Sequence, residues 1–102
     1  MSIWSEPVSE GRTLKINIEG RFDFSSHQEF RESYEANGRE RPTEYLVDMR
    51  STTYLDSSAL GMLLLLRDYA GGDSGKILIV NCNPDVRKIL SISNFEQLFN
   101  IE

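Results

Sequence analysis

Apolar and polar side chains alternate over residues 13–19, TLKINIE. A period of two is typical of a β-strand with one buried face, so this segment predicts a strand. Trp4 and Val8 indicate an earlier edge strand, which Pro7 interrupts and a turn at Gly11 ends. Together the two segments predict a hairpin at the N-terminus.

A first helix is predicted after residues 20–24, GRFDF. Ser26 followed three residues later by Glu29 is the pattern of a capping box, in which the two residues satisfy free amides of the first turn. The residues that follow place apolar side chains at helical spacing, and we expect the helix to end near Gly38. The polar segment 39–43, RERPT, then predicts an irregular connection.

Two mostly apolar segments, 44–49 (EYLVDM) and 76–81 (KILIVN), predict two further strands. Continuous apolar strands are typical of parallel sheets, so we expect these two to be buried on both faces. Between them a helix is predicted from Ser57 to Tyr69, followed by two glycines. A strand, helix and strand of this length predict parallel strands joined by a right-handed crossover.

A third helix is predicted from Asn83, because Asn at the N-cap, Pro84 at the first helical position and Asp85 in the first turn are each favoured there. The last residues, FEQLFNIE, predict a turn and a short strand that dock on the core. The predicted order is β-β-α-β-α-β-α with a terminal strand, which is an α/β fold.

Length and composition narrow the classes of function. The 102 residues suffice for one domain with one core. A net charge of -5 argues against nucleic-acid binding and against a polybasic membrane-surface protein. One cysteine, Cys82, and one histidine, His27, exclude an internal disulfide and a structural zinc site. The sequence shows no signal peptide and no apolar run near the ~20 residues of a membrane span, so we expect a cytoplasmic protein without membrane insertion.

The segment with candidate chemistry is 54–61, YLDSSALG. Asp56, Ser57 and Ser58 lie where a loop after a strand enters a helix, at the sheet edge where open α/β folds place their sites. The simplest interpretation is capping of the helix by Asp56 or Ser57. A cap needs one such residue, so three together also indicate a functional loop.

The helix after this loop is apolar on two sides. One stripe contains Leu60, Leu63 and Leu64, and the other contains Met62, Leu65, Leu66 and Tyr69. We expect both stripes to be buried, one by the sheet and one by the first helix. The alternative is that one side is available to a partner.

The sequence does not favour an enzyme. The serines lack a G-x-S-x-G context, and the one candidate base, His27, falls on the predicted packing face of the first helix, where we expect a partly packed, non-catalytic side chain. Residues 71–77, GGDSGKI, depart from the phosphate-binding loop pattern. Asp23 and Asp56 have no spacing that supports metal binding or acid–base catalysis, and no cofactor is indicated.

Four segments together resemble the STAS domain, the fold of anti-sigma factor antagonists. They are GRFDF (20–24), YLVDMRSTTYLDSSALGMLLLL (45–66), ILIVNCNPDVRKIL (77–90) and the closing FEQLF. The resemblance covers nearly the whole chain and implies a single STAS domain over residues 1–102. It implies a mixed sheet of four to five strands with three to four helices, mainly packed on one face.

The resemblance also implies a function. Family members are non-enzymatic switches that a serine kinase, often an anti-sigma factor with a histidine-kinase-like ATPase domain, phosphorylates and a PP2C-type phosphatase dephosphorylates. The segment GRFDFSSHQEF resembles a branch of the family whose partner kinase and phosphatase domains occur on response regulators. The acceptor falls on Ser58, with Ser57 as the alternative, and Asp23, Asp56 and Ser57 form its environment. We expect a partner to contact Phe22, Phe24, Leu55, Ala59, Leu60, Gly61 and Met62.

Two functions remain open at this point. In the first, an unphosphorylated chain binds a partner and a phosphorylated chain releases it, because the partner would have to desolvate a dianion. In the second, the chain is a non-phosphorylated structural subunit of a larger complex such as a transporter.

Overall fold

Two N-terminal strands form the hairpin that the alternating pattern predicts. The computed structural model describes residues 2–35 and 41–102. Strand β1 (Ile3–Val8) pairs antiparallel with β2 (Thr13–Ile18), and a 3₁₀ turn, η1 (Ser9–Gly11), joins them. Pro7 lies within β1, which is an edge strand, where a missing ladder donor is tolerated.

The main sheet has five strands in the order β1-β2-β4-β6-β7. Strands β4 (Glu44–Asp48), β6 (Ile77–Val80) and β7 (Asn100–Ile101) run parallel to β2, so the sheet is mixed. The described residues include three α-helices, α1 (His27–Tyr34), α2 (Ser57–Tyr69) and α3 (Pro84–Ile92). This architecture confirms the predicted α/β class and the STAS-like arrangement.

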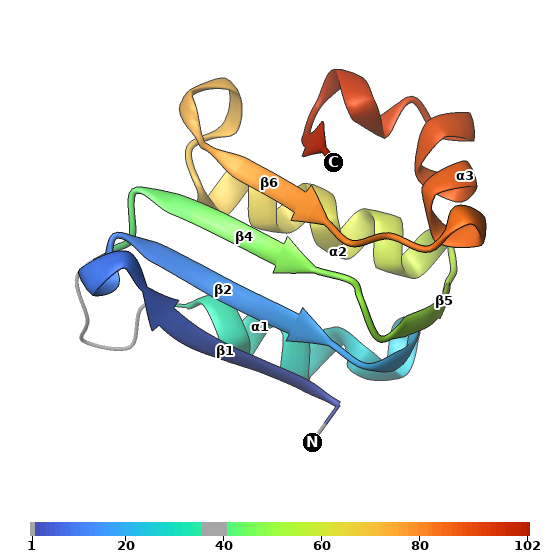
Figure 1. The fold of residues 1–102 in the computed structure, drawn as a ribbon, viewed down its shortest axis with the longest axis horizontal. Coiled ribbons are helices and arrows are strands. Elements are labelled where there is room, and N and C mark those ends of the chain that lie inside the picture. The colour runs from blue at the N-terminus through green and yellow to red at the C-terminus, as the bar shows by residue number, and fades with distance from the viewer. Residues whose placement is uncertain (1, 36–40) are drawn as a thin grey trace.

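The helices cover one face of the sheet. Helices α1 and α2 lie behind it, and α3 packs beside β5 (Thr52–Leu55) at the end of the sheet (Figure 1). The face toward the viewer carries no helix in the described part of the chain. No described helix combines the length and the apolar character that crossing a membrane requires.

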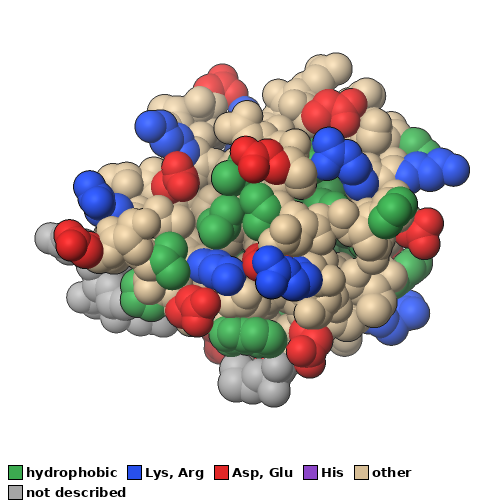
Figure 2. All heavy atoms as spheres, viewed as in Figure 1, with side chains coloured by type: hydrophobic (Ala, Val, Ile, Leu, Met, Phe, Trp, Pro, Cys, Tyr) green, Lys and Arg blue, Asp and Glu red, His purple; other side chains and the backbone are tan. Residues whose placement is uncertain are grey.

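Strands β4 and β6 are buried on one face, so the prediction that they are buried on both is wrong. Val47 and Ile79 are fully enclosed, whereas Leu46 and Leu78 on the other face are only half-buried. Figure 2 shows hydrophobic side chains gathered on this open face. An apolar strand sequence therefore does not guarantee that a helix covers both faces of the sheet. Here the apolar side chains of the open face are only partly covered, by their neighbours on adjacent strands.

The open face also carries a row of three charged side chains, Glu6, Lys15 and Asp48. Lys15 Nζ lies 3.9 Å from Glu6 Oε1 and 3.6 Å from Asp48 Oδ2. Asp48 Oδ1 accepts hydrogen bonds from the Arg50 backbone N–H at 2.9 Å and from Asn81 Nδ2 at 3.2 Å. Burial raises the pKa of Asp48, but the two hydrogen bonds and the charge of Lys15 outweigh it, so the pKa lies below its ordinary value.

A second, two-stranded sheet is absent from the sequence prediction. Strand β3 (Gly20–Phe22) pairs in parallel with β5 beyond the carboxyl end of the main sheet. Thr52 connects this small sheet to β2 and to the start of α3. Its hydroxyl donates to the Ile18 carbonyl at 2.9 Å, and its carbonyl accepts from Asn83 Nδ2 at 3.0 Å. Strands of three and four residues are too short to show a clear alternating pattern.

The ends of the helices confirm some expectations and correct others. Asn83 caps α3 as predicted, because its Oδ1 accepts from the Val86 amide at 2.8 Å. Helix α1 ends at Tyr34, and Gly38 lies outside the described residues, as does part of the predicted connection 39–43. The predicted capping box of Ser26 and Glu29 is wrong, since Ser26 makes no side-chain cap at α1.

Helix α2 has the predicted bounds but not the predicted burial. The residues packed into the core are Ala59, Met62, Leu63 and Leu66. Leu64 and Leu65 are 38% and 50% exposed. The expectation of full burial is therefore wrong, and the alternative of one available side describes the helix. The sheet and α1 therefore leave the side of α2 with Leu64 and Leu65 uncovered.

Candidate functional site

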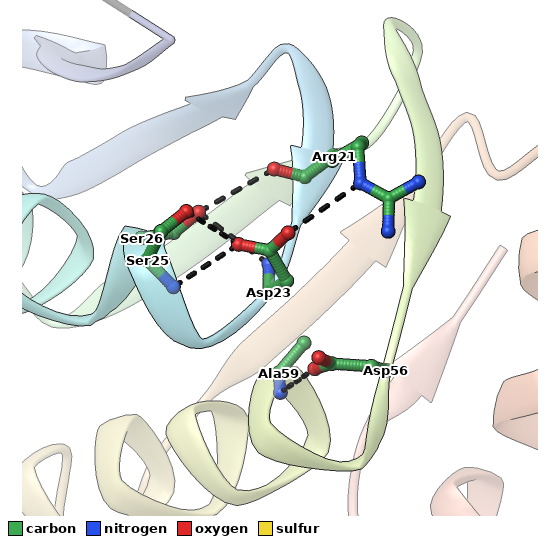
Figure 3. A network of polar contacts seen from close by, with 6 residues as sticks. All are labelled: Arg21, Asp23, Ser25, Ser26, Asp56 and Ala59. Atoms are coloured by element: carbon green, nitrogen blue, oxygen red, sulfur yellow. Dashed lines mark hydrogen bonds and ion pairs between the residues drawn. The ribbon is translucent and has the colours of Figure 1, made fainter.

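The pairing of β3 with β5 brings two loops together. Phe22 lies opposite Leu55 in the register, and the Asp56 amide donates to the Phe22 carbonyl at 3.4 Å. Asp23 and Asp56 are the next residues of their strands. The two carboxylates therefore follow the carboxyl ends of adjacent parallel strands, at the edge where open α/β sheets place their sites (Figure 3).

Each of the two aspartates caps the helix that follows it. Asp56 Oδ1 accepts from the Ala59 amide at 2.9 Å at the start of α2, which confirms the capping interpretation. Asp23 caps the 3₁₀ turn η2 (Phe24–Ser26), and the capping box predicted for α1 lies here instead: the Asp23 amide donates to Ser26 Oγ at 3.4 Å. The prediction placed the capping box three residues too late in the chain, because the 3₁₀ turn η2 comes before α1.

Asp23 is held by several donors at once. Its Oδ1 accepts from the Ser25 hydroxyl at 2.6 Å and from the Ser25 amide at 3.0 Å, and its Oδ2 lies 3.5 Å from Arg21 Nε. The Ser25 hydroxyl is the main cause that lowers the pKa of Asp23 below its ordinary value, and Arg21 adds to it. The Arg21 guanidinium also lies over the Tyr54 ring, 4.5 Å from its centroid.

The two candidate acceptor serines occupy the first two positions of α2. Ser57 is exposed and Ser58 is half-buried. Within the described residues neither hydroxyl has a hydrogen-bond partner. The first amides of a helix lack intrahelical acceptors, so the N–H groups of these serines can receive a negative charge.

Helix geometry places Ser58 on the side of α2 that faces α1. Ser58, Met62 and Leu65 follow at spacings of four and three residues, which stack side chains on one face. Met62 and Leu65 line a narrow groove together with residues of α1, namely His27, Phe30, Arg31 and Tyr34. His27 is exposed to solvent while it lines this groove, as a partly packed side chain does.

The residues expected to contact a partner divide into two groups. Phe22, Leu55, Ala59 and Met62 are at most 3% exposed and belong to the core. Phe24 is 74% exposed, Gly61 is exposed and Leu60 is half-buried. The structure offers only the second group to a partner, because the first supports the loops from beneath.

Sequence reasoning missed part of this surface. Leu64 and Leu65 are exposed on α2, and Arg21 with Tyr54 flanks the Asp23 loop. Strand β3 has three residues, which are too few to show a period of two, so the sequence pattern gave no signal for it. Among the described residues no three His, Cys, Asp or Glu side chains come together as a metal site.

A family model described as "Mlab, STAS domain" matches residues 6–100. The chain belongs to the STAS domain family. A STAS-domain containing protein of Pseudomonas aeruginosa (strain UCBPP-PA14) is 59% identical to it over 101 residues, covering 99% of both chains. The predicted family is therefore confirmed.

Solved STAS structures share the fold. The anti-sigma factor antagonist SpoIIAA in its unphosphorylated form has a TM-score of 0.74 at 20% identity, covering 98% of this chain and 86% of that one. The Bacillus cell fate determinant SpoIIAA in its phosphorylated form has a TM-score of 0.73 at 20% identity, covering 98% and 90%. A sulfate transporter family protein from Wolinella succinogenes has a TM-score of 0.72 at 15% identity, covering 86% and 75%.

Proposed function

We propose that this STAS domain is a phospho-regulated protein-binding switch of the anti-sigma factor antagonist type. It binds a partner while Ser58 is unmodified and releases it when Ser58 is phosphorylated. The observation that carries the proposal is the half-buried hydroxyl of Ser58 at the start of α2, which has no hydrogen-bond partner among residues 2–35 and 41–102 and lies on the side of the helix with the exposed Leu65. The turn η2, with the exposed Phe24, packs against the same helix.

The partner that the chemistry requires is a serine kinase, with a PP2C-type phosphatase acting in reverse. The kinase, which has a histidine-kinase-like ATPase domain, transfers the γ-phosphoryl group of ATP to Ser58 Oγ. The new O–P bond forms as the bond to ADP breaks, and the hydroxyl proton passes to a base of the kinase. The phosphatase adds water across the O–P bond and returns the hydroxyl and inorganic phosphate.

The local structure supports a switch that changes the surface and keeps the fold. A phosphoryl group brings about -1.5 to -2 charges, which the free amides of Ser57 and Ser58 favour at the positive end of α2. Asp23 and Asp56 oppose the added charge by repulsion. The chain is similar to SpoIIAA in both its unphosphorylated and its phosphorylated form, with TM-scores of 0.74 and 0.73, so the shared fold accommodates either state.

The release follows from desolvation. Phe24 and Leu65 are exposed apolar side chains, and a partner that covers them also excludes water from the Ser58 loop. Excluding water from a dianion costs several kcal/mol unless the partner supplies a new cation. A partner shaped for the neutral hydroxyl therefore loses most of its affinity.

The first test is the position of phosphate in the cell. The chain is affinity-purified from its own host, and the tryptic peptide spanning residues 51–67 is fragmented to locate phosphate. We expect phosphate on Ser58 that disappears in Ser58→Ala and persists in Ser57→Ala. Phosphate on neither serine under any growth condition would overturn the proposal.

The second test is the effect of charge on the complex. Proteins that co-purify with the wild-type chain are quantified against Ser58→Asp, with Ser57→Asp as a control of equal charge one residue away. We expect a kinase-containing complex that Ser58→Asp loses and Ser57→Asp largely retains. Equal recovery with all three chains contradicts the switch.

The likeness to a sulfate transporter family protein favours a second candidate, a structural subunit that is not phosphorylated. A stable complex of fixed stoichiometry, unchanged by Ser58→Ala and by Ser58→Asp, is the result that this candidate predicts. The same two variants thus separate the candidates.

A further inference from the structure

The outward face of the small sheet carries one cation among two carboxylates. Phe22 and Leu55 point into the core, so their neighbours on either side point outward. Those neighbours are Arg21 on β3 and Tyr54 on β5, together with Asp23 and Asp56, which directly follow the two strands. Arg21 is the one positive group of this set, and it lies opposite Tyr54 in the register.

Arg21 is available for another anion. Its side chain is 67% exposed, and its contact with Asp23 is a long one of 3.5 Å. Asp23 does not depend on it, because the Ser25 amide and hydroxyl, at 3.0 Å and 2.6 Å, hold the same carboxylate. In Figure 3 the Asp23 carboxylate lies between Arg21 and the serines of η2, and Asp56 and Ala59 at the start of α2 lie below it.

We propose that Arg21 is the counter-charge of a phosphoryl group on Ser58. In the unmodified protein its guanidinium rests on the Tyr54 ring and beside Asp23. Once Ser58 is phosphorylated, the dianion draws the guanidinium, whose planar donors match phosphate oxygens better than a single carboxylate contact. Arg21 then offsets the repulsion from Asp23 and Asp56. This inference deepens the proposed phosphorylation of Ser58 and rests on it for its biological role.

The test installs phosphoserine at position 58 during translation, so that no kinase is needed. The ³¹P resonance is titrated with pH, and its midpoint gives the second pKa of the phosphate. A nearby cation favours the dianion and lowers this pKa. We expect Arg21→Gln to raise the midpoint by about half a pH unit or more, and Arg21→Lys to restore part of the difference.

Matched controls remove the same charge elsewhere. Arg12→Gln lies at the opposite end of the sheet, where the Arg12 carbonyl accepts from the amides of Thr43 and Glu44. Arg87→Gln tests the cations of α3, which packs against β5. Because histidine titrates in the same pH range, the series is repeated in a His27→Gln background. Amide spectra of each protein check that the fold is retained.

The outcomes separate the inference from the function. A shift in Arg21→Gln that is absent in Arg12→Gln and shrinks at high salt supports the counter-charge. An equal midpoint in wild type and Arg21→Gln, or a larger shift in Arg87→Gln, overturns it. Absence of phosphate on Ser58 in cells overturns the proposed function alone, since the installed phosphoserine still reports on Arg21.

Discussion

The loops that begin at Asp23 and Asp56 follow the ends of two paired strands, yet their serine side chains differ in hydrogen bonding. In the Asp23 loop, Ser25 and Ser26 both form side-chain hydrogen bonds, and the carboxylate accepts from several donors. In the Asp56 loop the carboxylate caps one amide, and within the described residues the hydroxyls of Ser57 and Ser58 have no partner. The first loop is a fixed support, and the second presents chemical groups that the fold does not use.

The largest expected effect on stability comes from Phe22, the core residue that supports both loops. Phe22 is fully buried beneath both of them and packs against Phe30, with ring centroids 4.9 Å apart and the rings tilted by 52°. We expect Phe22→Ala to lower the free energy of unfolding by about 3–5 kcal/mol. Phe24→Ala, two residues away and 74% exposed, should change it by no more than about 0.5 kcal/mol.

Urea unfolding of the two variants measures this difference. In the same pair, Phe24→Ala should weaken partner binding while the fold is intact. Equal destabilisation by both substitutions would mean that Phe24 belongs to the core and not to the binding surface.

Removal of the α2 cap should have the next largest effect. Asp56→Ala deprives the Ala59 amide of its acceptor, and we expect a loss of about 1 kcal/mol in the free energy of unfolding. Asp56→Ser retains an acceptor oxygen and should recover most of the loss. Thermal unfolding followed by circular dichroism checks the pair, and an unchanged transition in Asp56→Ala contradicts the assigned cap.

The serines themselves give a smaller contrast. Ser26 is buried and its hydroxyl bonds the Asp23 amide and the Arg21 carbonyl, both at 3.4 Å, so Ser26→Ala should cost about 1 kcal/mol. Ser58→Ala removes no hydrogen bond and should leave stability within about 0.5 kcal/mol of wild type. The midpoints of urea unfolding measure the stability of both variants. A marked loss of stability in Ser58→Ala would assign this hydroxyl a structural role.

The smallest effect is a change in titration. The Ser25 hydroxyl favours the charged form of Asp23, so Ser25→Ala should raise the pKa of Asp23 toward its ordinary value of 3.8. A carboxyl whose folded pKa is depressed adds stability above its unfolded pKa and loses it as the pH falls through the folded pKa. Carbon-detected NMR of the side-chain carboxyls measures the shift, and Ser57→Ala is the control that should leave Asp23 unchanged.

Much of this fold follows from local patterns in the sequence. The hairpin, the bounds of α2 and the Asn83 cap of α3 were predictable, because each depends on residues close together in the chain. The loop with Asp56, Ser57 and Ser58 was also placed at the correct sheet edge, since these residues stand between a strand and a helix.

The remaining features depend on contacts between distant segments. The pairing of β3 with β5 joins residues more than thirty positions apart, and three-residue strands carry no period of their own. The exposure of Leu64 and Leu65 depends on how far α1 extends over α2, which an apolar helix sequence does not encode. The neighbours of Arg21 became evident only when Tyr54 was placed across the sheet from it.

The charged pairs on the open face give the molecule a preferred side. Lys15 between Glu6 and Asp48 would lose its hydration if another sheet or an apolar partner covered that face, and the half-buried Leu46 and Leu78 offer too little in return. Stacking through the open sheet is therefore discouraged, much as inward charges protect sheets from unwanted association. A partner of the kind proposed above would therefore meet less resistance on the helical side, which carries the loop with Ser58.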